Sequence, residues 1–407
     1  MAEGQCPQSQ TASPCQVNNK TNWIVFSKGI LLNFPHGGAT AQGVNSNTSA
    51  LNAALITPFP TASKTRNERD SGQFQNQGCQ PATAQPTRLP TPVKVNRLAF
   101  YLTGFEEQFR KNLIDGFTFG FGLHFQGPSK ASGAKNLISA MQRPEVVDSK
   151  LIKERQSGRI QGPFSYPPLS NLRVSPLGVI PKKAPGEFRM IHHLSFPYGD
   201  SINTFIPSEF STVKYATVDD AINFIKFLGR GCVLAKTDVR SAFRIIPVHP
   251  SDYPLLGLQW RGQWYYDRCL PMGCSSSSKT FESLSTAMEW IARKKLGIPH
   301  ILHTLDDFLI IGESTSDCQA KLQRFLHFCE DIGVPMAPEK TEGPSPVLTF
   351  AGIELDSVEM EARLPQNKVA KCKEFISEFL ERWKVKAGLH STICWPDRIG
   401  ARIVRVV

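Results

Sequence analysis

The feature that most constrains this chain is a pair of aspartates inside an apolar stretch, TLDDFLIIG at residues 304–312. Aspartate is depleted in β-strands because its carboxylate competes for backbone hydrogen bonds and favours turns. Asp306 and Asp307 therefore predict the tight turn of a β-hairpin, with both carboxylates held near one point. Two unit charges about 4 Å apart repel by roughly 4 kcal/mol at an effective dielectric near 20. A bound cation would relieve this repulsion, whereas a solvated surface turn remains the alternative.

A further isolated aspartate closes another β-like stretch, CVLAKTD at residues 232–238. One carboxylate at the end of a strand, beside a hairpin that carries two more, is the arrangement that a two-Mg²⁺ phosphoryl-transfer site requires. For Asp238 alone, a simple strand-end cap is the alternative.

The charge balance indicates a polyanionic partner. The 407 residues contain 46 Lys and Arg against 35 Asp and Glu, a formal net charge of +11. This excess fits a nucleic acid, although a generically basic protein has the same balance. The ten cysteines show no CxxC pair and no zinc-site spacing, so we expect reduced thiols in an intracellular protein, with nucleus or cytoplasm left open. No apolar run approaches the roughly 20 residues of a membrane span, and we expect no membrane partner.

The chain changes character near residue 90. Residues 1–90 are rich in Ser, Thr, Asn and Gln, and they predict a mostly disordered low-complexity arm with room for a short element at 23–34. From residue 93 apolar residues recur at helical spacing through residue 113, and a turn and strand are expected at 115–122.

The core mixes strands and helices without strict βαβ alternation, which predicts an α+β fold with an antiparallel sheet backed by helices. Thr217 and Asp220 form the pattern of a capping box at the start of a helix. Besides the two arms of the Asp-Asp hairpin, strands are expected at 177–182, 188–192, 233–238, 255–260, 264–270 and 348–355, and helices at 146–156, 217–228, 278–296, 317–332 and 368–384.

Six short motifs follow one another in an order that resembles the fingers and palm of reverse transcriptases. They are SPLGVIPKK (175–183) with GEFRM (186–190), TDVRSAF (237–243), LPMG (270–273), LDDF (305–308), EKT (339–341) and FAG (350–352). The sequences around and between these motifs resemble the polymerase of DIRS-type tyrosine-recombinase retroelements. Examples are GRIQGPF (158–164), IHHLSFP (191–197) and CLPMGC (269–274). The resemblance covers about residues 91–385. It implies an N-terminal polymerase extension at 91–172, fingers and palm at 173–365, and a partial helical thumb at 366–407.

The resemblance implies an RNA-directed DNA polymerase, a nucleotidyltransferase that extends a primer on an RNA or DNA template with deoxynucleoside triphosphates. Asp238 and Asp306 would each ligate Mg²⁺, two ions in all, and Asp307 would be a weaker ligand or an orienting group. Val239 would add a backbone carbonyl to the metal site. Lys340 stands where the family often has a lysine near the leaving pyrophosphate, and a general-acid role and an ordinary surface lysine are both open.

The resemblance also assigns substrate-binding residues. Phe243 stands at the position of the steric gate that excludes a ribose 2′-hydroxyl, with an ordinary core phenylalanine as the alternative. Lys182 and Arg189 flank a fingers hairpin and would contact phosphate oxygens, although Lys183 and a solvated basic turn are alternatives. Met272 and Gly273 would line the nucleotide pocket, where Gly273 lets the backbone approach a base closely.

Departures from the family pattern leave an alternative function open. Thr304 replaces the usual aromatic residue before the Asp-Asp pair, and His193 replaces a usual aspartate. After residue 387 the resemblance ends, so a truncated thumb or gene-model artefact is expected, with weak grip on a template–primer duplex. The alternative is therefore a catalytically inactive nucleic-acid-binding remnant. An unrelated metal-dependent phosphohydrolase would leave Phe243 and Arg189 unexplained. Oligomeric state is not predicted.

Overall fold

The computed structural model describes residues 24–25, 31–32, 88–182, 186–387 and 405–406. The chain separates into two compact units, Met1–Pro81 and Ala82–Val407. In the first unit β1 (Ile24–Val25) pairs antiparallel with β2 (Leu31–Leu32), in the segment where a short element was expected. The remainder of the arm predicted to be disordered lies outside the described residues.

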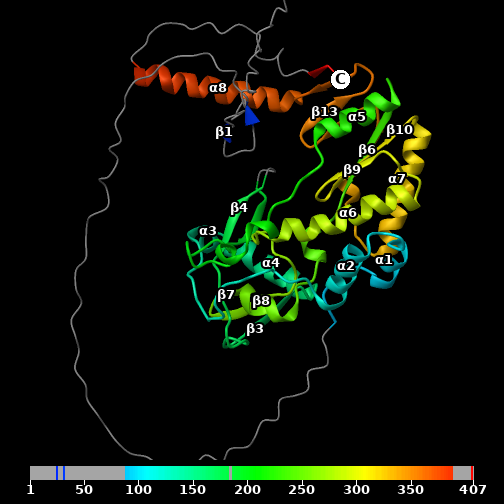
Figure 1. The fold of residues 1–407 in the computed structure, drawn as a ribbon. Coiled ribbons are helices and arrows are strands. Elements are labelled where there is room, and N and C mark those ends of the chain that lie inside the picture. The colour runs from blue at the N-terminus through cyan, green and yellow to red at the C-terminus, as the bar shows by residue number, and fades with distance from the viewer. Residues whose placement is uncertain (1–23, 26–30, 33–87, 183–185, 388–404, 407) are drawn as a thin grey trace, which may run out of the picture. The chain divides into compact units, whose positions relative to one another are not determined.

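An antiparallel sheet forms the centre of the second unit (Figure 1). Its strand order is β11-β6-β10-β9, so strands distant in sequence lie side by side. The four strands are β6 (Val233–Asp238), β9 (Ile301–Thr304), β10 (Asp307–Gly312) and β11 (Glu342–Ser345).

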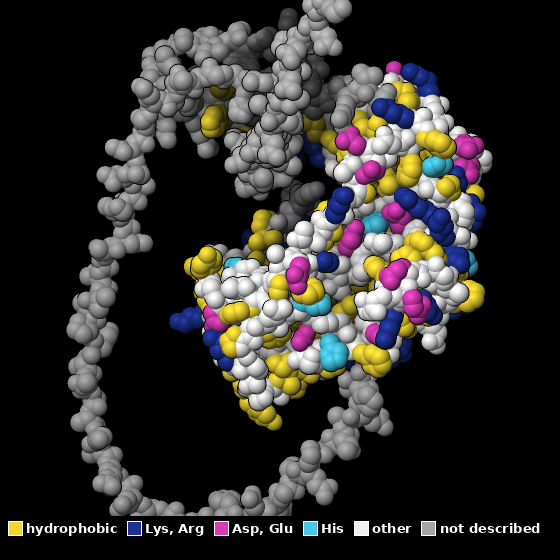
Figure 2. Space-filling view, viewed as in Figure 1, with side chains coloured by type: hydrophobic (Ala, Val, Ile, Leu, Met, Phe, Trp, Pro, Cys, Tyr) yellow, Lys and Arg dark blue, Asp and Glu magenta, His cyan; other side chains and the backbone are white. Residues whose placement is uncertain are grey.

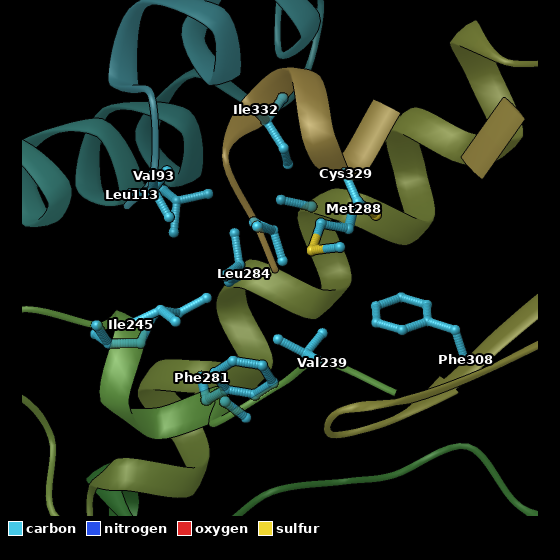
Figure 3. Close-up of a cluster of buried hydrophobic side chains, with 14 of the residues drawn as sticks. Val93, Leu113, Val239, Ile245, Phe281, Leu284, Met288, Phe308, Cys329 and Ile332 are labelled. Atoms are coloured by element: carbon cyan, nitrogen blue, oxygen red, sulfur yellow. The ribbon is translucent and has the colours of Figure 1, made fainter. Parts of the chain in front are cut away.

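Strand β10 is buried on both faces of this sheet, which explains why it reads as a continuous apolar run after Asp307 rather than an alternating one. In β10, Phe308 and Ile310 face one core cluster, and Leu309 and Ile311 face another. The first cluster fills the space between the sheet and the helices α6 (Ser277–Lys295) and α7 (Thr315–Ile332) (Figure 3). The Asp-bearing ends of β6 and β10 are therefore held by packing from two sides.

Helix α5 (Val218–Leu228) begins where the sequence predicts. It covers the second cluster and starts with the expected capping box. The Asp220 N–H donates to Thr217 Oγ1 (3.2 Å), and the Thr217 N–H donates to Asp220 Oδ2 (2.7 Å). Such reciprocal bonds satisfy donors that a helix start otherwise leaves unpaired.

Smaller sheets and helices surround this centre. Helices α3 and α4 pack with β3, β4, β5, β7 and β8 around a third cluster. Hairpin β4–β5 and sheet β3-β8-β7 are separate from the central sheet, as is sheet β12-β13-β14-β15. The remaining elements are α1 (Val95–Tyr101), α2 (Glu107–Phe119), α3 (Ile138–Gln142), α4 (Pro144–Gln156), β3 (Ile160–Phe164), β4 (Leu177–Pro181), β5 (Phe188–His192), β7 (Gly257–Trp260), β8 (Gln263–Asp267), β12 (Val347–Phe350), β13 (Ile353–Asp356), β14 (Glu361–Arg363), α8 (Gln366–Ala387) and β15 (Arg405–Val406).

Short 3₁₀ helices carry several loop residues. They are η1 (Asn203–Phe205), η2 (Ser208–Phe210), η3 (Ala242–Ile245), η4 (Pro250–Leu256) and η5 (Pro338–Lys340).

The expected α+β class is confirmed, but several boundaries were wrong. The single helix expected from residue 95 is divided into α1, which ends at Tyr101, and α2, and the segment between them contains Gly104 with a φ of 87°. Helix α2 then continues through the turn and strand expected at 115–122 as far as Phe119, and it stops at Gly120 (φ 98°). The strand expected at 348–355 is the hairpin β12–β13, because the backbone reverses at Ala351 and Gly352 with φ of 46° and 85°.

The surface of the described part mixes charges of both signs. On the face shown in Figure 2, Lys and Arg side chains lie among Asp and Glu side chains. Within the described residues, no helix combines the length and apolar character needed to cross a bilayer.

Candidate active site

The Asp-Asp pair lies at a two-residue hairpin turn, as predicted. Strands β9 and β10 pair Thr304 with Asp307, which leaves Leu305 and Asp306 as the turn. Leu305 has a φ of 54°, a left-handed conformation that costs a bulky residue on the order of 1–2 kcal/mol. Two bonds hold the turn in place: Ser285 Oγ of α6 donates to the Leu305 carbonyl (2.7 Å), and the Val239 N–H donates to the Asp306 carbonyl (3.0 Å). Backbone strain supported by its surroundings is typical of functional sites.

Strand pairing brings the third carboxylate to the same place. Asp238 is the last residue of β6, and it lies directly opposite Asp307 of β10. Residues opposite one another in an antiparallel pair have Cβ atoms about 5 Å apart. The structure therefore gathers Asp238, Asp306 and Asp307 at one end of the central sheet.

The carboxylates affect each other's ionisation. The pKa of Asp307 is raised to about 6, first by burial and then by the charge of Asp238 and a hydrogen bond to its carboxyl group. Burial and the charge of Asp238 also raise the pKa of Asp306. A shared proton or a bound cation is what such a cluster needs in order to lower its free energy.

Lys340 supplies a positive charge. Its Nζ donates to Asp238 Oδ1 at 2.7 Å, although its side chain is 57% exposed and that of Asp238 only 8%. Burial would lower the pKa of Lys340, but the hydrogen bond to Asp238 and the charges of all three aspartates raise it. The backbone supports this contact, since the Ala337 N–H donates to the Asp238 carbonyl at 2.8 Å.

Val239 contributes through its backbone alone. Figure 3 places its side chain between Phe281 and Phe308 in the core, and the residue is 1% exposed. Its N–H is bound to Asp306, and among the described residues no hydrogen bond goes to its carbonyl oxygen. The carbonyl is therefore the one polar atom of Val239 that is free to meet a ligand.

The donor chemistry at this site fits a hard divalent cation. Within the described part of the chain, no three His, Cys, Asp or Glu side chains converge in a geometry that holds a metal. Lys340 occupies one oxygen of Asp238 in this arrangement. The three carboxylates and the Val239 carbonyl are nonetheless all oxygen donors, which Mg²⁺ prefers, and one lysine balances only part of their charge.

Phe243 lies five residues after Asp238 in η3, and its side chain is partly buried. Its ring meets Phe281 of α6 edge to face, with centroids 5.7 Å apart. The ring thus lies at the edge of the core. This position fits both a steric gate against a ribose 2′-hydroxyl and an ordinary core phenylalanine.

The loop after β8 carries Met272 and Gly273. The Met272 side chain is 56% exposed. A Cβ added at Gly273 would lie 2.2 Å from the His192 carbonyl oxygen, so glycine is required there by the protein's own backbone. Asn203 fixes this loop, because its Nδ2 donates to the Gly273 carbonyl (2.8 Å) and its Oδ1 accepts from the Ser275 N–H (2.9 Å).

The two basic residues of the fingers hairpin differ in their contacts. Lys182 pairs with Glu187 (3.0 Å) on the exposed end of hairpin β4–β5. Arg189 pairs with Ile180 through the backbone and is exposed, and its side chain makes no hydrogen bond or ion pair to the described residues. Residues 183–185, which include Lys183 and most of the expected turn, lie outside those described.

Sequence reasoning missed the residues that hold these loops. Asn203 was not singled out, and neither was Arg244, a buried arginine bound to Glu154 and Asp267. The partners Gly273, Glu154 and Asp267 are 23 to 90 residues away in the chain, so no local spacing could identify these contacts. The only available signal for Arg244 was its charge inside the apolar run AFRIIPV (242–248).

Residues 180–355 match the model of the family described as "Reverse transcriptase (RNA-dependent DNA polymerase)". Every residue proposed for the site from sequence lies inside this range. A Gag-Pro-Pol polyprotein of squirrel monkey retrovirus is 26% identical over 128 residues, which are 29% of this chain and 7% of the relative. The expected enzyme class, a nucleotidyltransferase of the RNA-directed DNA polymerase type, is the class that these matches support.

Similar solved structures include a foamy viral protease-reverse transcriptase in complex with double-stranded DNA, with 14% identity and a TM-score of 0.48. The match covers 71% of this chain and 60% of that one. A complex of the foamy viral enzyme with an RNA/DNA hybrid gives 16% identity and a TM-score of 0.46 over 71% of this chain and 38% of that one. This chain thus spans a small part of the matched polyprotein and 38–60% of these structures.

Proposed function

We propose that this chain is an RNA-directed DNA polymerase, starting from the reverse transcriptase match of residues 180–355. In this proposal it adds deoxynucleotides to a primer 3′-hydroxyl under the direction of an RNA or DNA template. The observation that carries the proposal is the gathering of Asp238, Asp306 and Asp307 at one end of a sheet, with Lys340 bound to Asp238. We further propose an origin in a DIRS-type retroelement, and this proposal rests only on the amino-acid sequences around and between the motifs.

Two magnesium ions would be held by Asp238 and Asp306, with Asp307 and the Val239 carbonyl as supporting ligands. When bound, such ions activate the attacking hydroxyl and neutralise charge on the triphosphate and the leaving pyrophosphate. The protein's contribution is to keep these oxygen donors fixed. The paired strands β6 and β10 do so, since their packing on both faces leaves the backbone little freedom.

The other residues act on the nucleotide. The Lys340 ammonium, protonated at neutral pH because its pKa is raised, would be released from Asp238 to meet the developing charge of pyrophosphate. Arg189, whose side chain has no partner among the described residues, presents a fork of donors suited to phosphate oxygens. The Phe243 ring would stand beside the sugar and exclude a 2′-hydroxyl.

The second candidate is binding of nucleic acid without catalysis. Helix α8 favours it, since none of its side chains from Gln366 to Glu381 is buried and Phe375 and Phe379 are 53% and 60% exposed. A helix with so little packing would give the template–primer a weak grip even if the carboxylates were intact.

The test is extension of a DNA primer on an RNA template in Mg²⁺, with Asp238→Asn as the matched control. The proposal predicts extension by the wild-type protein and none by the variant, with equal binding of the template–primer by both. Binding without extension by the wild-type protein would reject the proposal in favour of the second candidate.

A further inference from the structure

We propose that Arg244 is a positioning residue that holds both halves of the nucleotide pocket, the Phe243 ring and the Met272–Gly273 loop, in one fixed arrangement. This inference rests on the proposed function, since it assigns a task to a residue behind the proposed pocket. Arg244 itself touches neither substrate nor metal in the proposal.

The guanidinium of Arg244 makes bonds in three directions. It donates to Asp267 at the end of β8 in a two-pronged contact, Nη1 to Oδ2 (2.7 Å) and Nη2 to Oδ1 (2.8 Å). Toward α4 it donates from Nε (3.1 Å) and Nη2 (2.9 Å) to Glu154 Oε2. Nη1 also donates to the backbone carbonyls of Cys269 (3.2 Å) and Leu270 (3.3 Å).

Arg244 is connected to both pocket segments, to one through a partner and to the other through its own backbone. Leu270 is two residues before Met272, so its carbonyl is an anchor for the start of that loop. Arg244 follows Phe243 directly within η3, and its N–H donates to the Ser241 carbonyl at 2.7 Å. One side chain therefore fixes the backbone of η3 relative to the backbone that enters the Met272–Gly273 loop.

The cluster is buried, and its charges are matched within it. Glu154 and Asp267 are 1% and 4% exposed, and Arg244 is 9% exposed. Burial would raise the pKa of Glu154, but Arg244, Arg159 and Lys150 together lower it to about 2. Removing the arginine would leave two carboxylates in a low-dielectric site without their shared partner, and the surrounding segments would have to move to admit water.

Lysine is a poor substitute at this position. A single ammonium cannot make the two-pronged contact with Asp267 while also reaching Glu154 and two carbonyls. Arg244→Lys keeps the charge and much of the volume, so it tests the geometry of the guanidinium rather than the presence of a cation.

The experiment measures steady-state primer extension for each variant, with KM and kcat for a deoxynucleotide and for the matching ribonucleotide, and Kd for the template–primer. Displacement of a pocket by about 1 Å costs on the order of 100-fold in efficiency. Arg244→Lys should raise the KM of the deoxynucleotide about 10- to 100-fold and reduce the preference for deoxyribose, while the Kd of the template–primer stays unchanged.

Arg363→Lys is the matched control. Arg363 also binds several carboxylates, with Nε to Glu354 (2.8 Å) and Nη2 to Asp356 (2.9 Å), but it lies in the β13–β14 hairpin, which carries no proposed pocket residue. This variant should lose stability and retain KM and sugar preference.

Glu154→Gln is a second test variant that leaves Arg244 and Asp267 in place. It should shift the KM and the sugar preference in the same direction as Arg244→Lys but by a smaller factor. It keeps the test open if Arg244→Lys does not fold.

Unchanged KM and sugar preference in both Arg244→Lys and Glu154→Gln, with only a loss of stability as in Arg363→Lys, would overturn the inference and leave the proposed function standing. A wild-type protein that incorporates no nucleotide would reject the proposed function, and the inference with it.

Discussion

At the scale of single residues, the proposed chemistry depends on three carboxylates, and within the described residues a single lysine, Lys340, is bound to them. Asp307 and Asp306 both have a raised pKa because burial and Asp238 disfavour their charged forms. Lys340 is the one ammonium bound to this group of side chains within the described residues. Removing the Lys340 side chain is therefore the direct way to decide whether Lys340 is a general acid or an ordinary surface lysine.

Lys340→Gln should lower the rate of nucleotide incorporation by about 100-fold, the lower range of general-acid effects, with little change in template–primer binding. Rapid-quench measurement of single-nucleotide addition would give this rate. Lys94→Gln, which removes an ammonium that donates to the Glu330 carbonyl, is the control and should behave as wild type. An unchanged rate in Lys340→Gln would identify Lys340 as an ordinary surface lysine.

Phe243→Ala should reduce the preference for deoxynucleotides by about ten-fold or more, which corresponds to about 1.4 kcal/mol of discrimination. Phe243→Tyr keeps the bulk of the ring and should retain the preference. Incorporation rates for matched deoxy- and ribonucleotides give the ratio. If Phe243→Ala only lowers the melting temperature, then the contact with Phe281 is the whole role of the ring.

At the scale of elements, the sequence predicted the strands and helices whose signals are local. The apolar arms around Asp306 and the Thr217 capping box were predicted because strand composition and helix caps depend on neighbouring residues. The β12–β13 hairpin was missed because Ala351, a residue with no preference for positive φ, takes a φ of 46° at the turn. Arg244 and Asn203 were missed because their partners become neighbours only in the folded chain.

The hairpin with the Asp-Asp turn rests on a buried histidine. His303 of β9 lies between Glu282 and Glu289 of α6, with its Nε2 3.1 Å from Glu282 Oε1. Burial would lower its pKa, but the hydrogen bonds to both glutamates and their charges raise it to about 9 from an ordinary value of 6.5. The charged histidine therefore stabilises the packing of β9 on α6 through its ionic hydrogen bonds to the two glutamates.

The interaction of His303 with the two glutamates should weaken in alkaline solution. Because the pKa of the folded state is raised, the stabilisation is fully present below pH 6.5 and is lost as the pH rises through about 9. The difference in unfolding free energy between the wild-type protein and His303→Gln should shrink by up to about 3 kcal/mol over that interval. Urea unfolding at several pH values measures it, with His327→Gln on the exposed face of α7 as the control. A difference that does not change with pH would contradict a charged His303.

At the scale of the whole molecule, the full sequence carries a formal net charge of +11, and on the face shown in Figure 2 Lys and Arg side chains lie among Asp and Glu side chains. The division into an N-terminal extension (91–172), fingers and palm (173–365) and a partial thumb (366–407) stays a prediction. A polymerase must nonetheless bind the phosphate backbone of its template–primer, and the excess of Lys and Arg is the means available to this chain.

Binding of an RNA/DNA duplex should therefore weaken steeply with salt. If six phosphates are contacted, as a round estimate, the logarithm of the association constant should fall with log salt at a slope of about −5. Fluorescence anisotropy across a salt series gives the slope, and Asp238→Asn should show the same value as wild type because it changes no cation. A flat response would argue against a basic channel for the duplex.

The measurement that tests the central claim most directly is single-turnover incorporation of one deoxynucleotide opposite each of the four template bases. It compares the wild-type protein with Asp306→Asn, and template–primer binding is determined in the same samples. The account predicts that the wild-type protein adds the nucleotide complementary to the template base in Mg²⁺, and that Asp306→Asn binds equally well and adds none. Incorporation retained by Asp306→Asn, or a wild-type protein that binds the template–primer and incorporates nothing, would contradict it.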